Sequence, residues 1–286
     1  MDWITGMQKA LNYIEDNITE NLDYEEIAKK AYVSSFHFQR VFSILCGYTL
    51  GEYIRNRRLT LAGSEISSSS AKIIDVALKY GYDTPESFSR AFTRFHGVTP
   101  TQARSGGANL KSFSRLSIKL LLEGGNVMNY RIEQKPEISL IGFKTQFIGD
   151  AAERFQQERD FWVNTRAEQD VLTTIEKGSN NIWYDVNTNF SDYGYDHYIA
   201  VESEKDTPDG YEQVRIQPHT YVICETDRVK YPTLLHMDLR KQIISEWLPS
   251  SGYVLSDAPE IAVTHWYQKL DDEKRYIELW IPIEKR

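Results

Sequence analysis

The sequence predicts two domains, an all-α amino-terminal domain with a double helix-turn-helix and an α+β domain of two βαββ halves. Three observations predict this organisation. The chain has 286 residues, more than one typical domain contains. Apolar residues recur every three or four positions in the first part of the chain and every second position in the rest. One pattern in the helical part occurs twice. We place the domains at residues 1–108 and 128–286, with residues 109–127 as a linker and leading strand.

Helices are expected throughout the first domain. Apolar spacing predicts an amphipathic helix over residues 7–18, and Asp23 has the character of an N-cap for a short helix after it. A break at residues 33–35 separates this short helix from a third helix over residues 36–46. Helix, tight turn, helix is the order of a helix-turn-helix motif.

A second copy of this motif follows a predicted linking helix over residues 51–66. It has its own start signal, with Thr84 as N-cap and Pro85 at the first helical position. The matched positions of the two copies are Phe38 and Phe88, Arg40 and Arg90, Phe42 and Phe92, Gly47 and Gly97, and Thr49 and Thr99.

The second domain is expected to contain strands because the apolar period falls to two after the linker. A leading strand is predicted over residues 116–122. The order strand, strand, helix, strand, strand then occurs twice, at an offset of about 80 residues. The predicted strands are 130–133, 138–147, 182–186, 198–202, 211–216, 221–225, 261–268 and 276–283, and the predicted helices are 151–169 and 231–247.

Charge is distributed unevenly along the chain. The net charge is −8, but residues 27–122 hold 14 Lys and Arg against 5 Asp and Glu, and residues 128–286 carry a net charge of −10. This asymmetry fits binding of a polyanion by the first domain alone. The composition, with 41% hydrophobic residues, two distant cysteines and no long apolar run, excludes disordered, disulfide-stapled and membrane-spanning classes. We expect a cytoplasmic protein without a membrane partner.

A family resemblance rests on the second copy of the motif. The segment from Ile73 to Tyr82, followed by Phe88-Ser89-Arg90-Ala91-Phe92, Gly97-Val98-Thr99-Pro100 and Arg104, resembles the AraC/XylS family of bacterial transcription regulators. The resemblance covers roughly residues 5–105. It implies a domain that binds double-stranded DNA, with each second helix in a major groove, and RNA polymerase as a further partner. Two such helices in one chain suffice for a monomer.

In the second helix of each motif, the residues that do not pack in the core are available to contact DNA. In the first copy, Gln39 can form hydrogen bonds with adenine, and Arg40 can form them with guanine or a phosphate. In the second copy, Pro85 has no side-chain donor, so recognition by that helix depends more on DNA shape. A solvated helix face is the alternative for the arginines in general, and a structural salt bridge or cap is the alternative for Arg40 and Arg90, which stand at matched repeat positions. The expected base-contacting residues are Phe36, Gln39, Arg40, Pro85, Glu86, Ser89 and Arg90. Candidate phosphate contacts are Arg55, Arg57, Arg58, Lys72, Arg94 and Arg104.

The closing segment of the chain carries a second resemblance. Tyr276-Ile277-Glu278-Leu279-Trp280-Ile281-Pro282-Ile283, with Tyr130-Arg131-Ile132-Glu133 and Ile141-Gly142, resembles GyrI-like (SOUL-like) effector-binding domains. The resemblance implies two halves around a central groove, with a glutamate that meets a cationic or polar ligand.

The residues themselves support such a ligand. Tyr276, Glu278 and Trp280 share one face of the predicted strand, and a carboxylate between two aromatic rings attracts an organic cation. We therefore expect a small aromatic or lipophilic effector, in particular a cationic one. Ordinary core packing is the alternative for each aromatic residue. The expected site residues are Glu278, Trp280, Tyr276, Trp183, Tyr198 and Trp266.

Two other functions stay open for the second domain, a hydrolase with Glu278 as general base and a protein-binding module. No catalytic residue, metal site or cofactor is expected, because the six His residues lack metal-ligand or triad spacing and no phosphate-binding Gly-rich loop occurs. The order of the domains, DNA-binding domain first, resembles that of Rob-like regulators. Activator and repressor both stay open, and we expect an activator.

Overall fold

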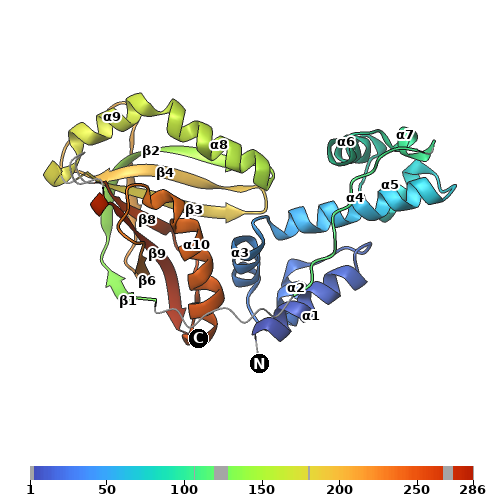
Figure 1. The fold of residues 1–286 in the computed structure, drawn as a ribbon, viewed down its shortest axis with the longest axis horizontal. Helices are drawn as coiled ribbons and strands as arrows, with labels where there is room; N and C mark the ends of the chain where they lie inside the picture. Colours follow the sequence, from blue (N-terminus) through green and yellow to red (C-terminus); the bar gives the residue numbers. More distant parts are fainter. Residues whose placement is uncertain (1–2, 106, 119–127, 180, 267–272, 286) are drawn as a thin grey trace. The chain divides into compact units, whose positions relative to one another are not determined.

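The structure is a computed structural model, and it describes residues 3–105, 107–118, 128–179, 181–266 and 273–285. The chain divides into two compact units (Figure 1). The main segments are Met1–Ser43 with Tyr48–Leu122 for the first unit and Glu123–Arg286 for the second.

The first unit is helical and contains both predicted helix-turn-helix motifs. The first motif consists of α2 and α3, the second of α5 and α6, and α4 is the predicted linking helix. The elements are α1 (Trp3–Asp16), α2 (Tyr24–Lys30), α3 (Ser35–Cys46), α4 (Leu50–Ser68), α5 (Ile73–Lys79), α6 (Pro85–His96) and α7 (Pro100–Arg104).

Local signals set the helix boundaries where the sequence predicts them. The Asp23 carboxylate accepts a hydrogen bond from the Glu25 backbone, and the Thr84 hydroxyl accepts one from the Ser87 backbone. Gly97 ends α6 with φ of 80°, a left-handed conformation that favours glycine. The caps agree with the sequence because they depend on residues two to four positions apart.

Each motif buries its aromatic residues in a core of its own. Phe38 and Phe42 are 1% and 0% exposed, and the matched Phe88 and Phe92 are both 0% exposed. Burial of a large apolar side chain contributes about 1.5–3 kcal/mol relative to leaving it in water. The repeated phenylalanines therefore fix one face of α3 and of α6 against the core.

The segment after α7 corrects one prediction. Residues 116–118 form no strand, and the remainder of the strand predicted over residues 116–122 lies outside the described residues. The segment instead runs extended along α4, where the Phe113 backbone donates to the Thr60 hydroxyl and the Leu116 backbone donates to the Tyr53 hydroxyl. Side chains alternate along any extended chain. The alternation of apolar residues after residue 115 therefore reflects an extended segment packed on α4, not a strand of a sheet.

The second unit is an antiparallel sheet with helices, as predicted. The long predicted helix over residues 151–169 is two helices, because Thr165 has non-helical backbone angles. The elements are β1 (Tyr130–Lys135), β2 (Ile138–Ile148), α8 (Ala151–Asn164), α9 (Arg166–Ile175), η1 (Lys177–Ser179), β3 (Ile182–Ser191), β4 (Gly194–Glu202), β5 (Glu212–Ile216), β6 (His219–Glu225), η2 (Pro232–Leu234), α10 (His236–Gln242), η3 (Ile243–Trp247), η4 (Leu248–Ser250), β7 (Tyr253–Leu255), β8 (Glu260–His265) and β9 (Tyr276–Lys285).

The strand order confirms the internal repeat. The order is β1-β6-β9-β8-β3-β4-β2-β5, with β7 paired to β9. When β1, β2, β3 and β4 are exchanged for β5, β6, β8 and β9, the same order results in reverse. The two halves are thus related by a pseudo-two-fold axis between β3 and β8. The first strand of each half pairs with a strand of the other half, β1 with β6 and β5 with β2.

The two faces of the sheet have different surroundings. The outer face carries Trp183 and Ile199 and packs against Leu172 of α9 and Phe161 of α8. These two helices cover β2 and β4 (Figure 1). The inner face is the opposite one, and buried side chains from both halves meet there. Its core residues are Leu140, Tyr184, Val186, Ala200, Val214, Ile216, Tyr221, Ile223, Ile261, Val263 and Trp280.

Candidate functional site

The second helices of the two motifs hold the residues expected to contact DNA. On α3, Phe36, Gln39 and Arg40 lie three and four positions apart, a spacing that puts them on one face. The Gln39 side chain donates a hydrogen bond to the Ser35 hydroxyl at 3.0 Å. Arg40 is 8% exposed.

On α6, Glu86 and Arg90 are exposed, and Pro85 and Ser89 are half-buried. Glu86 and Arg90 stand two positions before and after the buried Phe88, a spacing that puts them on the other side of the helix. The two arginines at matched repeat positions thus differ in exposure, and Arg90 is the clearer candidate for a contact with DNA.

Three of the arginines expected to contact phosphate have structural roles instead. Arg57 forms a two-pronged ion pair with Glu15, with N···O distances of 2.9 and 2.8 Å, and also donates to the Phe113 carbonyl. Arg58 donates to the carbonyls of Ile18 and Glu20, and Arg104 donates to that of Ala71. These guanidinium groups join elements of the first unit, so the prediction was wrong for them. Arg55, Lys72 and Arg94 are exposed and stay candidates.

In the second unit, Glu278 lies on the inner face of the sheet. It stands in β9 opposite Val263 of β8 and opposite Glu225 of β6. Its side chain is 13% exposed. Two glutamates directly opposite each other repel, so this arrangement needs a cation between them.

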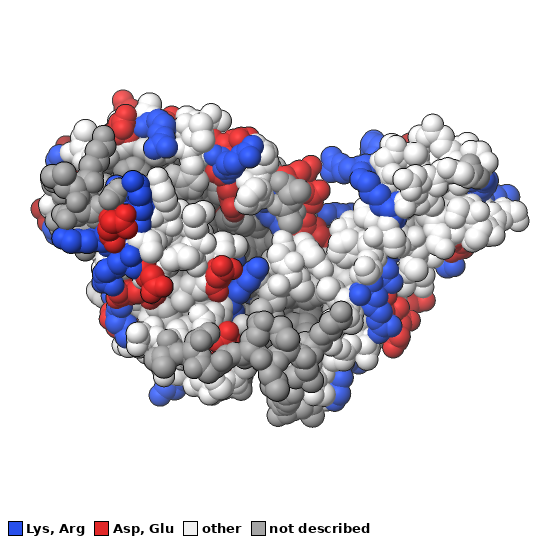
Figure 2. Space-filling model, in the orientation of Figure 1, with Lys and Arg blue, Asp and Glu red and all other residues white. Residues whose placement is uncertain are grey.

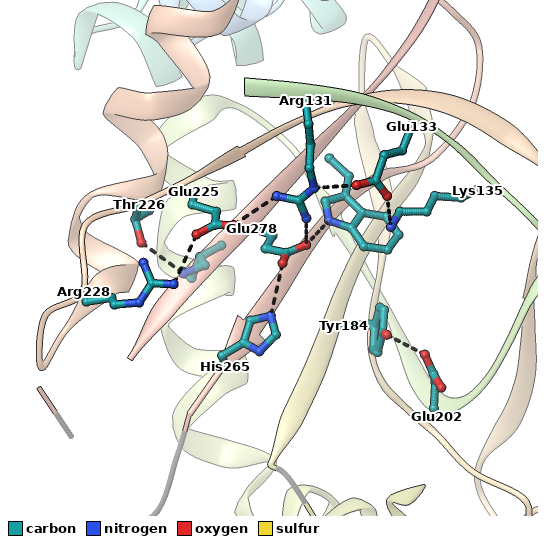
Figure 3. A network of polar contacts seen from close by, with 12 residues as sticks. Arg131, Glu133, Lys135, Tyr184, Glu202, Glu225, Thr226, Arg228, His265 and Glu278 are labelled. Atoms are coloured by element: carbon teal, nitrogen blue, oxygen red, sulfur yellow. Dashed lines mark hydrogen bonds and ion pairs between the residues drawn. The ribbon is translucent and has the colours of Figure 1, made fainter. Parts of the chain in front are cut away.

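Arg131 of β1 is that cation. Its guanidinium contacts Glu278 at 2.8 Å, Glu225 at 3.0 Å and Glu133 at 2.6 Å (Figure 3). Sequence reasoning missed this role for Arg131. The available signal was the alternation of Arg131, Glu133 and Lys135, which puts three charges on one face of a strand.

Glu278 is ionised over the whole physiological range. Burial alone would raise its pKa, but the nearby His265 side chain, a hydrogen bond from the Trp280 indole and the charge of Arg131 together lower its pKa to about 2. The indole nitrogen lies 2.9 Å and the His265 Nε2 3.7 Å from the carboxylate. The site therefore presents a stable negative charge beside an aromatic ring.

The structure brings some of the predicted site residues together. Tyr276, Glu278 and Trp280 lie on the inner face, where Trp280 is in edge contact with Tyr184 and packs against Tyr221. Tyr198 packs against the same core. Tyr184 donates to Glu202 at 2.6 Å, and burial together with this bond raises its pKa.

Two predicted site residues lie elsewhere. Trp183 and Trp266 pack on the outer face with Ile199 and Leu172. Successive residues of a strand point to opposite faces, so Trp183 points away from the inner face that its neighbour Tyr184 joins. The prediction that these two tryptophans share a surface with Glu278 was wrong.

A buried polar pair also lies on the outer face. The Asp185 Oδ1 and His197 Nε2 atoms are 3.9 Å apart, and both lack a hydrogen-bond partner among the described residues. The His197 Nδ1 lies 2.7 Å from the Asn187 side-chain oxygen and so carries the ring proton. Burial raises the pKa of Asp185 to about 7 and lowers that of His197 to about 3.

Comparisons with known proteins place both units. Residues 27–106 match the family described as helix-turn-helix domain, and residues 131–283 match the family described as integron-associated effector binding protein. The HTH-type transcriptional activator AarP of Providencia stuartii is 38% identical over 98 residues, which cover 34% of this chain and 73% of AarP. The chain belongs to the AraC-type transcription regulators. Its second unit belongs to the integron-associated effector binding protein family.

One further relative and one solved structure are similar to part of this regulator. The regulatory protein SoxS of Salmonella typhimurium is 38% identical over 98 residues, which cover 34% of this chain and 92% of SoxS. A solved structure of a transcription regulation protein from Staphylococcus aureus MU50 is 17% identical, covers 55% of this chain and 99% of its own, and has a TM-score of 0.45.

The described residues include neither a helix that could span a membrane nor a cluster that could bind a metal ion. None of the helices there has the length and apolar run needed to cross a bilayer. The described side chains also contain no group of three or more His, Cys, Asp or Glu arranged for a metal ion.

Proposed function

We propose that this regulator activates transcription from sites read by α3 and α6, under control of a small organic cation bound on the inner face at Glu278. The observation that carries the effector assignment is a carboxylate with a pKa of about 2 that contacts Trp280 on a face built of aromatic and apolar side chains. An ionised group removed from water requires a cation, and neighbouring aromatic rings favour an organic one.

The activator assignment is supported by the likeness to AarP, which is named a transcriptional activator. RNA polymerase is the partner that an activator requires. The two motifs lie in one unit, so a single chain has two helices for two successive major grooves, about 34 Å apart. We therefore propose a cytoplasmic protein that binds DNA as a monomer.

Binding rather than catalysis is the role we propose for Glu278. A general base works best when its pKa lies near the working pH. The pKa of about 2 makes Glu278 a weak proton acceptor at neutral pH and a persistent negative charge. This property suits recognition of a cation.

Selection of bound sequences from a random duplex pool, at a fixed salt concentration, tests the DNA-binding half. We expect an asymmetric site with two conserved segments one helical turn apart. Arg90→Ala should then cost about 1–3 kcal/mol and relax preference at one base pair. Arg94→Ala, one turn further along α6, is the matched control and should weaken binding to all sequences alike. Unchanged preference in Arg90→Ala would contradict the assignment of α6.

Titration with the fluorescent cation rhodamine 6G tests the effector half. Glu278→Gln keeps the shape of the side chain and removes its charge, so the affinity for the dye should fall at least about tenfold, the scale of a lost charge-assisted contact. An unchanged affinity would show that the cation site lies elsewhere.

A further inference from the structure

The inner face already holds cations of its own. Arg131 contacts the Glu278 carboxylate, Lys135 Nζ lies 4.4 Å from the Trp280 ring centroid, and the Arg228 guanidinium lies 4.3 Å from that of Tyr276. Each of the three groups that favour a cationic ligand is thus occupied by a basic side chain.

We propose that Arg131 and Lys135 of β1 are resident competitors of the effector, and that a cationic effector binds by displacing them from Glu278 and Trp280. This inference rests on the proposed cation site at Glu278. It adds that occupation of the site is coupled to release of β1.

The first support is the balance of charge. Three carboxylates, those of Glu133, Glu225 and Glu278, face three cations, those of Arg131, Lys135 and Arg228. Figure 2 shows basic and acidic side chains side by side on the visible surface of the second unit. A balanced cluster exerts little net attraction on a further cation. An incoming cation therefore gains the carboxylate only by exchange with a resident one.

The second support is the degree of exposure along the network. The side chain of Arg131 is 37% exposed, whereas that of Glu278 is 13% exposed. The guanidinium can return to water and keep Glu133 and Glu225 as partners, which are 36% and 35% exposed. The carboxylate of Glu278 has no such access. Displacement of Arg131 from Glu278 therefore costs little free energy, provided that the ligand gives the Glu278 carboxylate a positive partner.

The third support is the place of β1 in the sheet. β1 is an end strand, paired with β6, and among the described residues it is the first strand that follows the DNA-binding unit in the chain. Its side chains at Tyr130, Ile132 and Gln134 are exposed. Besides its backbone ladder and the edge contact of the Tyr130 ring with the Trp247 ring, β1 is held by the inward contacts of Arg131 and Lys135. Loss of these contacts loosens the strand through which the chain enters the effector-binding unit.

Competition by Arg131 predicts that its removal strengthens binding of the dye. Removal of a residue that supports Glu278 would weaken that binding. If Arg131 occupies the site, the measured affinity is the intrinsic affinity multiplied by the fraction of molecules in which the site is vacated. Arg131→Gln should then raise the affinity for rhodamine 6G by roughly tenfold, the scale of a partly buried charge pair. If Arg131 only orients Glu278, the same change should lower the affinity.

The experiment uses the full chain and fluorescence anisotropy of rhodamine 6G, with four variants. Arg131→Gln should bind more tightly than wild type, Arg131→Lys should resemble wild type, and Glu278→Gln should bind more weakly. Lys177→Gln is the matched control, because Lys177 forms an ion pair with Glu204 that is exposed and distant in sequence from β1. The anionic dye 8-anilinonaphthalene-1-sulfonate should gain nothing from Arg131→Gln.

The outcomes separate the two proposals. Weaker binding by Glu278→Gln together with unchanged or weaker binding by Arg131→Gln would overturn the competition and leave the proposed function intact. Unchanged binding by Glu278→Gln, or no binding by any variant, would overturn the cation site and the competition with it. Hydrogen exchange gives a second readout, since the amides of residues 130–135 should exchange faster when the dye is bound to wild type. Equal or slower exchange there would contradict release of β1.

Discussion

Asp185→Asn should stabilise the protein at high pH and not at low pH. In the native protein the His197 ring has its proton on Nδ1, so the Nε2 lone pair faces the Asp185 carboxyl at 3.9 Å. An ionised carboxylate would oppose this lone pair without a proton between them. A protonated Asp185 removes this negative charge, and the amide of Asn is neutral at every pH.

The size of the effect follows from the pKa of Asp185. Its ordinary pKa is 3.8, and burial raises it to about 7 in the folded protein. The native state therefore keeps a proton that the unfolded state loses, and stability falls as pH rises from 3.8 to about 7. At about 1.4 kcal/mol per pH unit the cost above pH 7 is at most about 4 kcal/mol, and relaxation around the group reduces it. We expect Asp185→Asn to gain about 2 kcal/mol at pH 8.

Urea unfolding followed by tryptophan fluorescence measures this gain, because five of the six tryptophans lie in the second unit. The free energies of unfolding of wild type and Asp185→Asn should differ at pH 8 and coincide near pH 3.5. Asp206→Asn, in an exposed loop of the same unit, is the control for loss of a carboxylate. A gain of the same size at both pH values, or no gain at pH 8, would refute the reasoning.

Three further changes test other parts of the structure. Glu278→Gln should lower the free energy of unfolding by about 1–3 kcal/mol at pH 7. Because the pKa of Glu278 is lowered in the folded protein, this difference is present above pH 4.5 and disappears toward pH 2. Urea titrations across that pH range measure it. Arg57→Ala leaves Glu15 buried without its partner and should destabilise the first unit by about 3 kcal/mol, measured by circular dichroism at 222 nm on heating. Gly63→Ala would place a methyl carbon 2.7 Å from the His96 ring and should lower the same unit's stability by about 1–3 kcal/mol, which the same melting experiment detects.

Features that depend on neighbours in sequence could be predicted well. Both helix-turn-helix motifs, the N-cap at Thr84 and the turn at Gly97 follow from residues a few positions apart. The phosphate contacts expected at Arg57 and Arg58 failed for the opposite reason. Their partners lie about forty positions away, at Glu15 and Ile18, and no local signal distinguishes such an arginine from an exposed one.

In the candidate site, too, features set by neighbours in sequence could be predicted, and contacts between distant residues could not. Alternation along β9 put Glu278 and Trp280 on one face, as the structure has them. The alternation along β1 puts Arg131 on one face with two other charges, but it cannot show that Arg131 reaches Glu278, because that contact depends on the register of β1, β6 and β9. The error at Trp183 has a simpler cause: a shift of one residue moves a side chain to the other face, and Tyr184 takes the inner position.

The exchange of leading strands between the two halves has a consequence for a cleaved chain. The halves are joined in sequence by the loop between β4 and β5, which contains exposed residues from Glu204 to Thr207. Each fragment produced by a cut there would still hold a strand of the other fragment's sheet, through the β1–β6 and β2–β5 ladders. Such fragments should remain together after cleavage and should reassemble when produced as separate chains. The loop then determines the effective concentration at which the halves meet, and these two ladders together with the β3–β8 ladder determine how they fit.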